Sequence, residues 1–294
     1  MPLTLPMDNS SITVGTGTLY VVATPIGNRD DITLRAVKTL MAVDLVVAED
    51  TRHTGRLLAH HEIPTAQTAY HEHNATRKTP RLINQLKTGD NLALVTDAGT
   101  PGVSDPGYRL VTTALDEGIP VIPIPGVSAL ITALSVSGLP TDSFVFIGFL
   151  PPKKARRTTQ ITDLADDPRT LIFYESPKRI HALITELASA WGNRPAVLGR
   201  EMTKLYEEFL RGRLSDIADR LARRPAVKGE CTLLVAGNTV KKPVPWELIR
   251  ASLADALSAG DRPLSVIVRE MAGEFKVSRN RVYQEALKIQ SDGP

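Results

Sequence analysis

Short apolar runs with almost no polar interruption constrain the fold of this chain more than any other feature. Four lie in its first half: Leu19–Ala23, Asp44–Ala48, Leu92–Thr96 and Val121–Ile124. Strands that are apolar on both faces are typical of a parallel sheet covered by helices. A helix is predicted after the first run, with Asp30 and Asp31 at its start. The residues predicted to share its inner face are Ala36, Val37, Leu40 and Met41.

A second group of apolar runs predicts another α/β unit with some antiparallel pairing. These runs are 143–151, 170–175, 196–201, 207–212 and 231–237. With 294 residues, the chain exceeds the size at which a single core stops growing. We expect an α/β protein with a flexible tail at 1–17, a parallel-sheet domain at 18–130, a second α/β domain with a mixed sheet at 131–240, and a helix-turn-helix-like segment at 241–294.

The C-terminal segment is predicted to follow a linker at 238–245. Its first helix is expected to end at Gly260, and Ser278 can cap its last helix. The basic residues of this part are Lys276, Arg279, Arg281 and Lys288. Helix-turn-helix modules often place their second helix against nucleic acid, although packing or dimer contacts are the alternative role.

Charge is unevenly distributed along the chain. Residues 1–150 carry 10 Lys and Arg against 14 Asp and Glu, whereas residues 151–240 carry 16 against 11. The basic clusters in the later part can neutralise phosphates or can simply form a solvated face. The single cysteine, Cys231, excludes an intramolecular disulfide and suits the cytoplasm. Neither a signal peptide nor an apolar run of the roughly 18 residues that span a membrane is expected.

Several common site motifs are absent. Gly15 and Gly17 precede the first apolar run, so they cannot form a dinucleotide-binding loop after a strand. Five of the six histidines fall between His53 and His73, and the pair His71 and His73 can alternate on a strand. No cysteine lies nearby, and we expect no metal site.

Loops rich in glycine, proline or small hydroxyl residues follow all four apolar runs of the first domain. They are Thr24–Asn28 (TPIGN), Glu49–Arg52 (EDTR), Asp97–Gly107 (DAGTPGVSDPG) and Pro125–Leu130 (PGVSAL). In an open α/β sheet, ligands bind outside the carboxyl ends of the strands. Glycine lets a ligand approach the main chain, and proline stiffens the loop. One such loop is an ordinary turn, but four at one edge favour a ligand cleft.

These loops are followed by FIGFLP at 146–151, FYESPKR at 173–179 and GREMTKLYEE at 199–208. In this order they resemble the tetrapyrrole methylase superfamily and, within it, the ribosomal RNA small subunit methyltransferase I family. The resemblance covers residues 18–240, and a further C-terminal segment is expected in that family. Small-molecule members of the superfamily carry a glycine-rich segment where this chain has TPIGN.

The resemblance implies two α/β domains of the tetrapyrrole methylase type, with S-adenosylmethionine in the cleft between them. It places Pro25 at the border of this cleft. The other cofactor contacts that it implies are Ala98, Gly99, Thr100, Val103, Ser104, Ser128, Ala129, Tyr174, Glu201 and Cys231. A neutral pocket lined by backbone is expected, because the loops are rich in glycine rather than charge.

The implied reaction is methylation of a ribose 2′-hydroxyl of a cytidine in 16S ribosomal RNA. The implied partners are that RNA or the assembled small subunit, and a second copy in a homodimer. A base can assist the poorly nucleophilic hydroxyl. The candidates are Glu49, Asp50, Glu175, Glu201, and Lys178 or Lys204 with a lowered pKa, and the sequence does not choose among them. Tyr206, Trp191 and Trp246 can stack on bases or pack in a core. The alternatives are a corrin-precursor methyltransferase and a non-catalytic RNA-binding protein.

Overall fold

The computed structural model describes residues 15–105, 107–239, 245–260 and 262–291. They form two compact units, divided after Asn238. Most of the expected tail and most of the expected linker lie outside the described residues. Gly17, at the end of the expected tail, donates its N–H to the Leu86 carbonyl at 2.7 Å.

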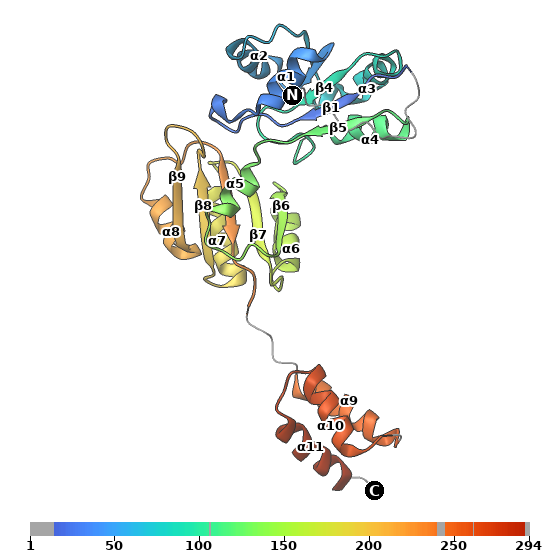
Figure 1. Cartoon of the computed structure of the whole chain (residues 1–294). Coiled ribbons are helices and arrows are strands. Elements are labelled where there is room, and N and C mark those ends of the chain that lie inside the picture. Colours follow the sequence, from blue (N-terminus) through green and yellow to red (C-terminus); the bar gives the residue numbers. More distant parts are fainter. Residues whose placement is uncertain (1–14, 106, 240–244, 261, 292–294) are drawn as a thin grey trace. The chain divides into compact units, whose positions relative to one another are not determined.

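The first sheet is entirely parallel, as the apolar runs predicted (Figure 1). Its strand order is β3 (Gln67–Ala69), β2 (Leu45–Ala48), β4 (Leu92–Val95), β1 (Leu19–Val22) and β5 (Val121–Ile124). The edge strand β3 escaped prediction because its three half-buried residues, QTA, form no apolar run. All five carboxyl ends meet at one edge of the sheet, because the strands are parallel.

Helices cover both faces of this sheet. They are α1 (Leu34–Ala42), α2 (Thr51–His60), α3 (Glu72–Lys87) and α4 (Tyr108–Asp116). One face packs α1 and α2 against Val22 and Val46, and the other packs α3 and α4 against Leu19 and Val47. Successive strand residues point to opposite faces, so uninterrupted apolar runs serve both cores.

The start and the inner face of α1 differ from the sequence prediction. Thr33 caps this helix by accepting a hydrogen bond from the Ala36 N–H at 3.1 Å. The predicted acidic pair, Asp30 and Asp31, instead lies in a separate 3-10 turn, η1 (Arg29–Asp31). Met41 was expected on the inner face, but its side chain is 47% exposed.

The second sheet is mixed, as expected. Its order is β6 (Phe144–Phe149), β7 (Thr170–Glu175), β10 (Cys231–Val235), β8 (Pro195–Arg200) and β9 (Glu208–Arg213). Only the β6–β7 pair is parallel. The helices α6 (Lys154–Asp163), α7 (Ile180–Trp191) and α8 (Leu214–Ala222) pack on one face. Trp191 is buried in this core and donates its indole N–H to the Ile161 carbonyl, so it cannot stack on RNA.

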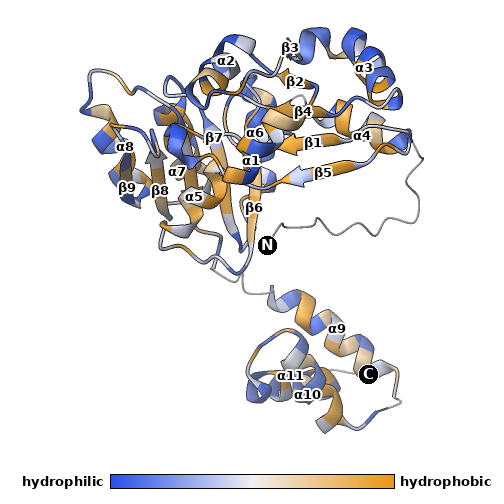
Figure 2. Ribbon diagram, turned by 45° about the horizontal axis from the view of Figure 1, so that its top comes forward, coloured by the Kyte–Doolittle hydropathy of each residue, from blue (hydrophilic) through white to orange (hydrophobic). Residues whose placement is uncertain are grey.

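The other face of the second sheet holds the two α/β domains together. The helix α5 (Ala129–Ser135) packs there with Ile26 and Val103, which come from loops of the first domain. Their partners on the sheet include Ile172 and Leu234. Figure 2 shows the apolar character of β1 and β6, which belong to different sheets. This shared apolar core fixes the strand-end loops of the first domain beside the second sheet.

The C-terminal unit consists, in its described part, of α9 (Trp246–Ser258), α10 (Leu264–Glu274) and α11 (Arg279–Ser291) around an apolar core. The first of these helices ends at Ser258 with Ala259 as its C-cap, and Gly260, which was predicted to end it, follows one residue later with φ +66°. The guanidinium of Arg281 lies 4.2 Å from the centroid of the Trp246 ring. Among the described residues, no helix combines the length and apolar character that crossing a bilayer requires.

Candidate functional site

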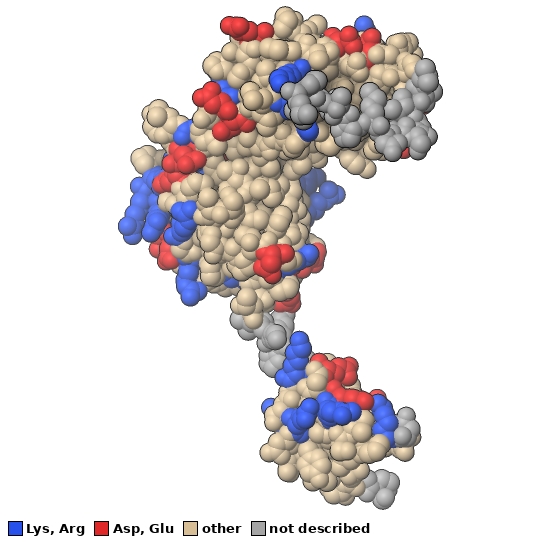
Figure 3. Space-filling view, viewed as in Figure 1, with Lys and Arg blue, Asp and Glu red and all other residues tan. Residues whose placement is uncertain are grey.

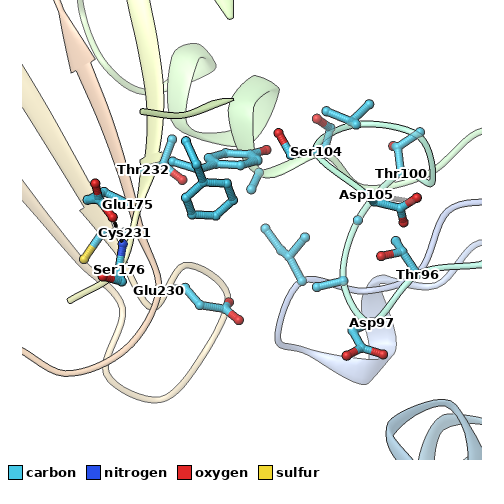
Figure 4. A pocket seen from close by; sticks show the side chains of 18 of the residues that line it. Thr96, Asp97, Thr100, Ser104, Asp105, Glu175, Ser176, Glu230, Cys231 and Thr232 are labelled. Atoms are coloured by element: carbon cyan, nitrogen blue, oxygen red, sulfur yellow. Dashed lines mark hydrogen bonds between the residues drawn. The ribbon is translucent and has the colours of Figure 1, made fainter. Parts of the chain in front are cut away.

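A cavity of about 450 Å³ lies between the strand-end loops of the first sheet and the second sheet (Figure 4). Its first wall comes from Ile26, Glu49, residues 96–100, residues 103–105, Ser128 and Ala129. Its second wall comes from Phe149, residues 174–177 and residues 230–232. The volume lies in the range of roughly 300–1,000 Å³ that is usual for small-molecule sites.

A backbone bridge between two loops shapes the first wall. Thr24 and Gly99 exchange both main-chain hydrogen bonds, at 2.9 and 3.0 Å. Gly99 takes φ +84°, which glycine adopts without strain. Its N–H is therefore engaged with Thr24 and is not open to a ligand. The neighbouring main chain of Ala98 has no hydrogen-bond partner in the part of the chain that the structure describes, so it can serve a ligand in the cavity.

Most of the predicted cofactor residues meet in this cavity. Those that line it are Ala98, Gly99, Thr100, Val103, Ser104, Ser128, Ala129, Tyr174 and Cys231. Pro25 and Glu201 do not line it. The next residue, Ile26, stands where Pro25 was expected, and Glu201 accepts hydrogen bonds from Lys204 Nζ and the Glu230 N–H. Contact with a cofactor stays a prediction for all of these residues.

The cavity is acidic, so the expectation of a neutral, backbone-lined pocket was wrong. Its carboxylates are Glu49, Asp97, Asp105, Glu175 and Glu230, and no Lys or Arg stands among the described lining residues. Burial and the nearby charge of Glu49 raise the pKa of Asp97. Several carboxylates around one cavity create a negative potential that favours a cationic ligand.

Tyr174 builds an aromatic wall on the second-domain side. Its ring makes edge contacts with Phe146 and Phe149, with centroids 4.9 and 5.8 Å apart. Its hydroxyl oxygen accepts a hydrogen bond from the Leu130 N–H at 3.1 Å, and burial raises the pKa of this hydroxyl. The ring is thus held rigidly where it can contact a planar group.

Two of the six candidate bases, Glu49 and Glu175, line the cavity. Glu175 is 3% exposed, and its Oε1 atom forms an ion pair with Arg179 at 2.7 Å and accepts the Ser176 N–H. Asp50 caps α2 and pairs with Arg52, and hydrogen bonds from Arg52 lower its pKa. The three remaining candidates, Lys178, Glu201 and Lys204, also lie outside the lining, and Glu201 pairs with Lys204.

Lys204 does not have the lowered pKa that was considered for it. Burial alone lowers its pKa, but hydrogen bonds to Glu201 and Glu230 outweigh this effect and raise it. Cys231 is not a nucleophile either, because burial raises the pKa of its thiol to about 12. Lys204 and Cys231 therefore have structural roles at the cavity and do not serve as a base or a nucleophile.

Asp97, Asp105 and Glu230 also line the cavity and were not predicted to do so. Asp97 and Asp105 stand inside the DAGTPGVSDPG loop, and Glu230 directly precedes Cys231, so attention to the charged neighbours of the chosen residues would have found them. His71 and His73, which could have alternated on a strand, lie instead at the start of a helix. His71 is the N-cap of α3, and His73 lies in its first turn. The described residues contain no cluster of three possible metal ligands.

Comparison with known proteins identifies the class to which this fold and cavity belong. The family model "Tetrapyrrole (Corrin/Porphyrin) Methylases" matches residues 18–218. A solved structure with the same fold is uroporphyrin-III C-methyltransferase from Thermus thermophilus in complex with S-adenosylhomocysteine. It has a TM-score of 0.54 and 20% sequence identity, and the match covers 76% of this chain and 98% of that one.

Two curated relatives show to which family within the tetrapyrrole methylases the chain is similar in sequence. Both are named ribosomal RNA small subunit methyltransferase I. The protein of Micromonospora olivasterospora is 45% identical, over 95% of this chain and 90% of the relative, and that of Halalkalibacterium halodurans is 51% identical, over 79% and 81%. The chain belongs to the ribosomal RNA small subunit methyltransferase I family of tetrapyrrole methylases.

Proposed function

We propose that this protein transfers the methyl group of S-adenosylmethionine to the ribose 2′-hydroxyl of a cytidine in 16S ribosomal RNA. The acidic cavity between the two α/β domains carries this proposal. S-adenosylmethionine supplies an electrophilic methyl group on a positively charged sulfur. Five carboxylates line the space that we assign to it, of which Glu175 and Glu230 are ion-paired with Arg179 and Lys204. Family membership supports both the cofactor and the RNA substrate.

The residues of the cavity fit the parts of this cofactor. The Tyr174 ring and Phe149 offer an apolar surface to the adenine, and the Ala98 main chain offers hydrogen bonds. The carboxylates favour the sulfonium and the ammonium group. Holding the methyl group in line with an attacking hydroxyl supplies much of the rate enhancement in a direct displacement.

Basic surfaces support RNA as the substrate. Figure 3 shows Lys and Arg side chains gathered over β9 and α8. The exposed ones in this region are Arg211, Arg213, Arg220, Arg223 and Lys228. In the C-terminal unit, Arg279 is exposed at the start of α11. Such residues can neutralise phosphates of a long substrate that extends beyond the cavity.

We also propose that the protein acts as a cytoplasmic homodimer. The single cysteine supports a reducing compartment, because it is a buried free thiol. The resemblance to its family supports the dimer. Light scattering coupled to size-exclusion chromatography measures the mass directly, and a mass near 32 kDa at micromolar concentration would contradict the dimer.

One labelling experiment tests the reaction. The purified protein is incubated with tritiated S-adenosylmethionine and, in separate reactions, small ribosomal subunits, naked 16S RNA or a corrin precursor, and the labelled product is then mapped. We expect label on the ribose of one cytidine. Label confined to a corrin precursor would support the alternative small-molecule function, and cofactor binding without any transfer would support a non-catalytic protein.

A further inference from the structure

A second hollow opens beside the cofactor cavity, at the same edge of the first sheet. Its volume is about 630 Å³, and its lining comes from the carboxyl ends of β2 and β3 and from the loop before α4. The lining residues are Glu49, His71, Glu72, His73, Ala75, Ser104, Asp105, Tyr108 and Arg109. Glu49, Ser104 and Asp105 line both spaces, so the two meet along this shared wall.

The strand order explains why there are two adjoining spaces. The first cavity is lined from the ends of β2, β4, β1 and β5, and the second from the ends of β2 and β4 and from the start of α3, which follows β3. A methyltransferase needs two such spaces in contact, because the acceptor must reach the methyl group from its own binding site. The shared wall is therefore the place where an acceptor in the second hollow meets a cofactor in the first.

The chemistry of the second hollow suits one unstacked nucleotide. Tyr108 is 71% exposed, although large aromatic side chains are usually buried, and it can stack on a base. The adjacent Arg109, which donates a hydrogen bond to Thr76 Oγ1, adds a positive charge for a phosphate. His71 and His73 place two further rings in the hollow, with centroids 6.0 Å apart.

Glu49 is the carboxylate on the shared wall that is best placed for a ribose hydroxyl. Its Oε2 atom accepts hydrogen bonds from Thr96 Oγ1 at 2.8 Å and from the Asp97 N–H at 3.3 Å. Its Oε1 atom has no partner among the residues that the structure describes. The other shared carboxylate, Asp105, uses its Oδ1 atom to hold the Gly102 and Gly107 N–H groups of its own loop.

We infer that the second hollow binds the target nucleotide of a single-stranded RNA segment. Tyr108 stacks on its base, and Arg109 contacts its phosphate. Glu49 Oε1 accepts the proton of its ribose hydroxyl as the hydroxyl oxygen bonds to the methyl carbon and the carbon–sulfur bond breaks, which would release S-adenosylhomocysteine. This inference rests on the proposed function, because it assigns the acceptor subsite of the same reaction. A second copy of this chain in the hollow is the competing occupant.

Tyr108→Ala tests the stacking contact. The matched control is Leu115→Ala, because Leu115 lies on α4 like Tyr108, is 58% exposed and lies outside both spaces. Binding of 16S RNA is measured by filter retention with S-adenosylhomocysteine present, and cofactor affinity is measured by calorimetry. We expect Tyr108→Ala to weaken RNA binding roughly tenfold and Leu115→Ala to leave it within about twofold, with unchanged cofactor affinity in both variants. Equal RNA affinity of the two variants would overturn the inference, and so would a Tyr108→Ala variant that changes only the oligomeric mass.

Glu49→Gln tests the hydroxyl contact, because the amide preserves size and removes the carboxylate. We expect kcat to fall about 100-fold or more, with the RNA Kd nearly unchanged. Wild-type kinetics of this variant would refute the role of Glu49. If the wild-type protein methylates RNA and these variants behave like it, this inference alone is wrong. If the wild-type protein methylates no RNA, both the proposed function and this inference are wrong.

Discussion

Thr24 and Gly99 form an isolated antiparallel bridge between loops that follow two neighbouring parallel strands. The hydroxyl of Thr24 also donates to the Thr96 carbonyl at 3.0 Å, and its side chain is buried. These bonds hold the DAGTPGVSDPG loop against the loop after β1. The loop is rich in glycine because its main chain must bend back over the strand ends.

Gly99→Asp is predicted to weaken the binding of S-adenosylhomocysteine at least about tenfold, since its side chain starts 3.5 Å from Ile26 at the cavity wall. Gly102→Asp is the matched control. Gly102 has the same φ of +84°, lies outside the cavity lining, and has no atom of another described residue within 4 Å of an added Cβ. Calorimetry should show near wild-type affinity for the control and a similar loss of melting temperature in both variants. Equal cofactor affinity of the two would place the site elsewhere.

Two substitutions at Tyr174 distinguish the contribution of its ring from that of its hydroxyl to stability and to cofactor binding. Tyr174→Phe keeps the edge contacts with Phe146 and Phe149 but leaves the Leu130 N–H unpaired. We predict that it lowers the free energy of unfolding by about 1 kcal/mol and retains cofactor affinity. Tyr174→Ala should lose both stability and affinity. If the phenylalanine variant binds the cofactor as weakly as the alanine variant, the hydroxyl rather than the ring makes the contact.

Glu208 should make the free energy of unfolding depend on pH in the acid range. Hydrogen bonds from Arg224 and Arg200 lower its pKa from 4.5 to about 2. Because the folded pKa is the lower one, this stabilisation is complete above about pH 4.5 and is lost as the pH falls toward 2. Urea unfolding should show that Glu208→Gln costs about 2 kcal/mol at pH 7 and progressively less below pH 4. A pH-independent cost would contradict the ion-pair assignment.

Glu117→Gln is the control for that experiment. Glu117 pairs with Lys87 at the surface, where both side chains are 44% exposed, so its replacement should change the free energy of unfolding by less than about 0.5 kcal/mol.

Cys231 is predicted to resist thiol reagents in the native protein. It is 4% exposed, and burial raises the pKa of its thiol to about 12, so almost no thiolate forms at pH 8. Reaction with Ellman's reagent should be slow in buffer and fast in denaturant. Rapid labelling of the folded protein at pH 8 would show that the thiol is accessible and ionised.

Replacing Arg279 and Arg281 together should weaken RNA binding and reduce the slope of log affinity against log salt concentration by up to about two. Arg281 also covers the Trp246 ring, so Arg281→Ala is expected to destabilise the C-terminal unit, whereas Arg279→Ala should not. The single Arg279→Ala variant therefore reports on RNA alone. An unchanged salt slope in that variant would remove this residue from the RNA interface.

The sequence predicted the parts of this protein that depend on strong periodic burial. The apolar runs predicted four parallel strands and the mixed character of the second sheet, because a strand buried on both faces must consist almost entirely of apolar residues. It missed β3, which is too short to show a pattern, and it misassigned His71 and Met41, whose positions depend on local capping and on helix rotation. The charge of the cavity was also mispredicted, because Asp97 and Glu230 come from distant segments that only the fold brings together.

The most direct test of the cofactor cavity is a crystal structure of the protein with S-adenosylhomocysteine. We expect the adenosyl group to lie between residues 98–104 and the Tyr174 ring, with its amino-acid part near the carboxylates. Ordered ligand density at any other place on the molecule, with this cavity filled only by solvent, would contradict the assignment.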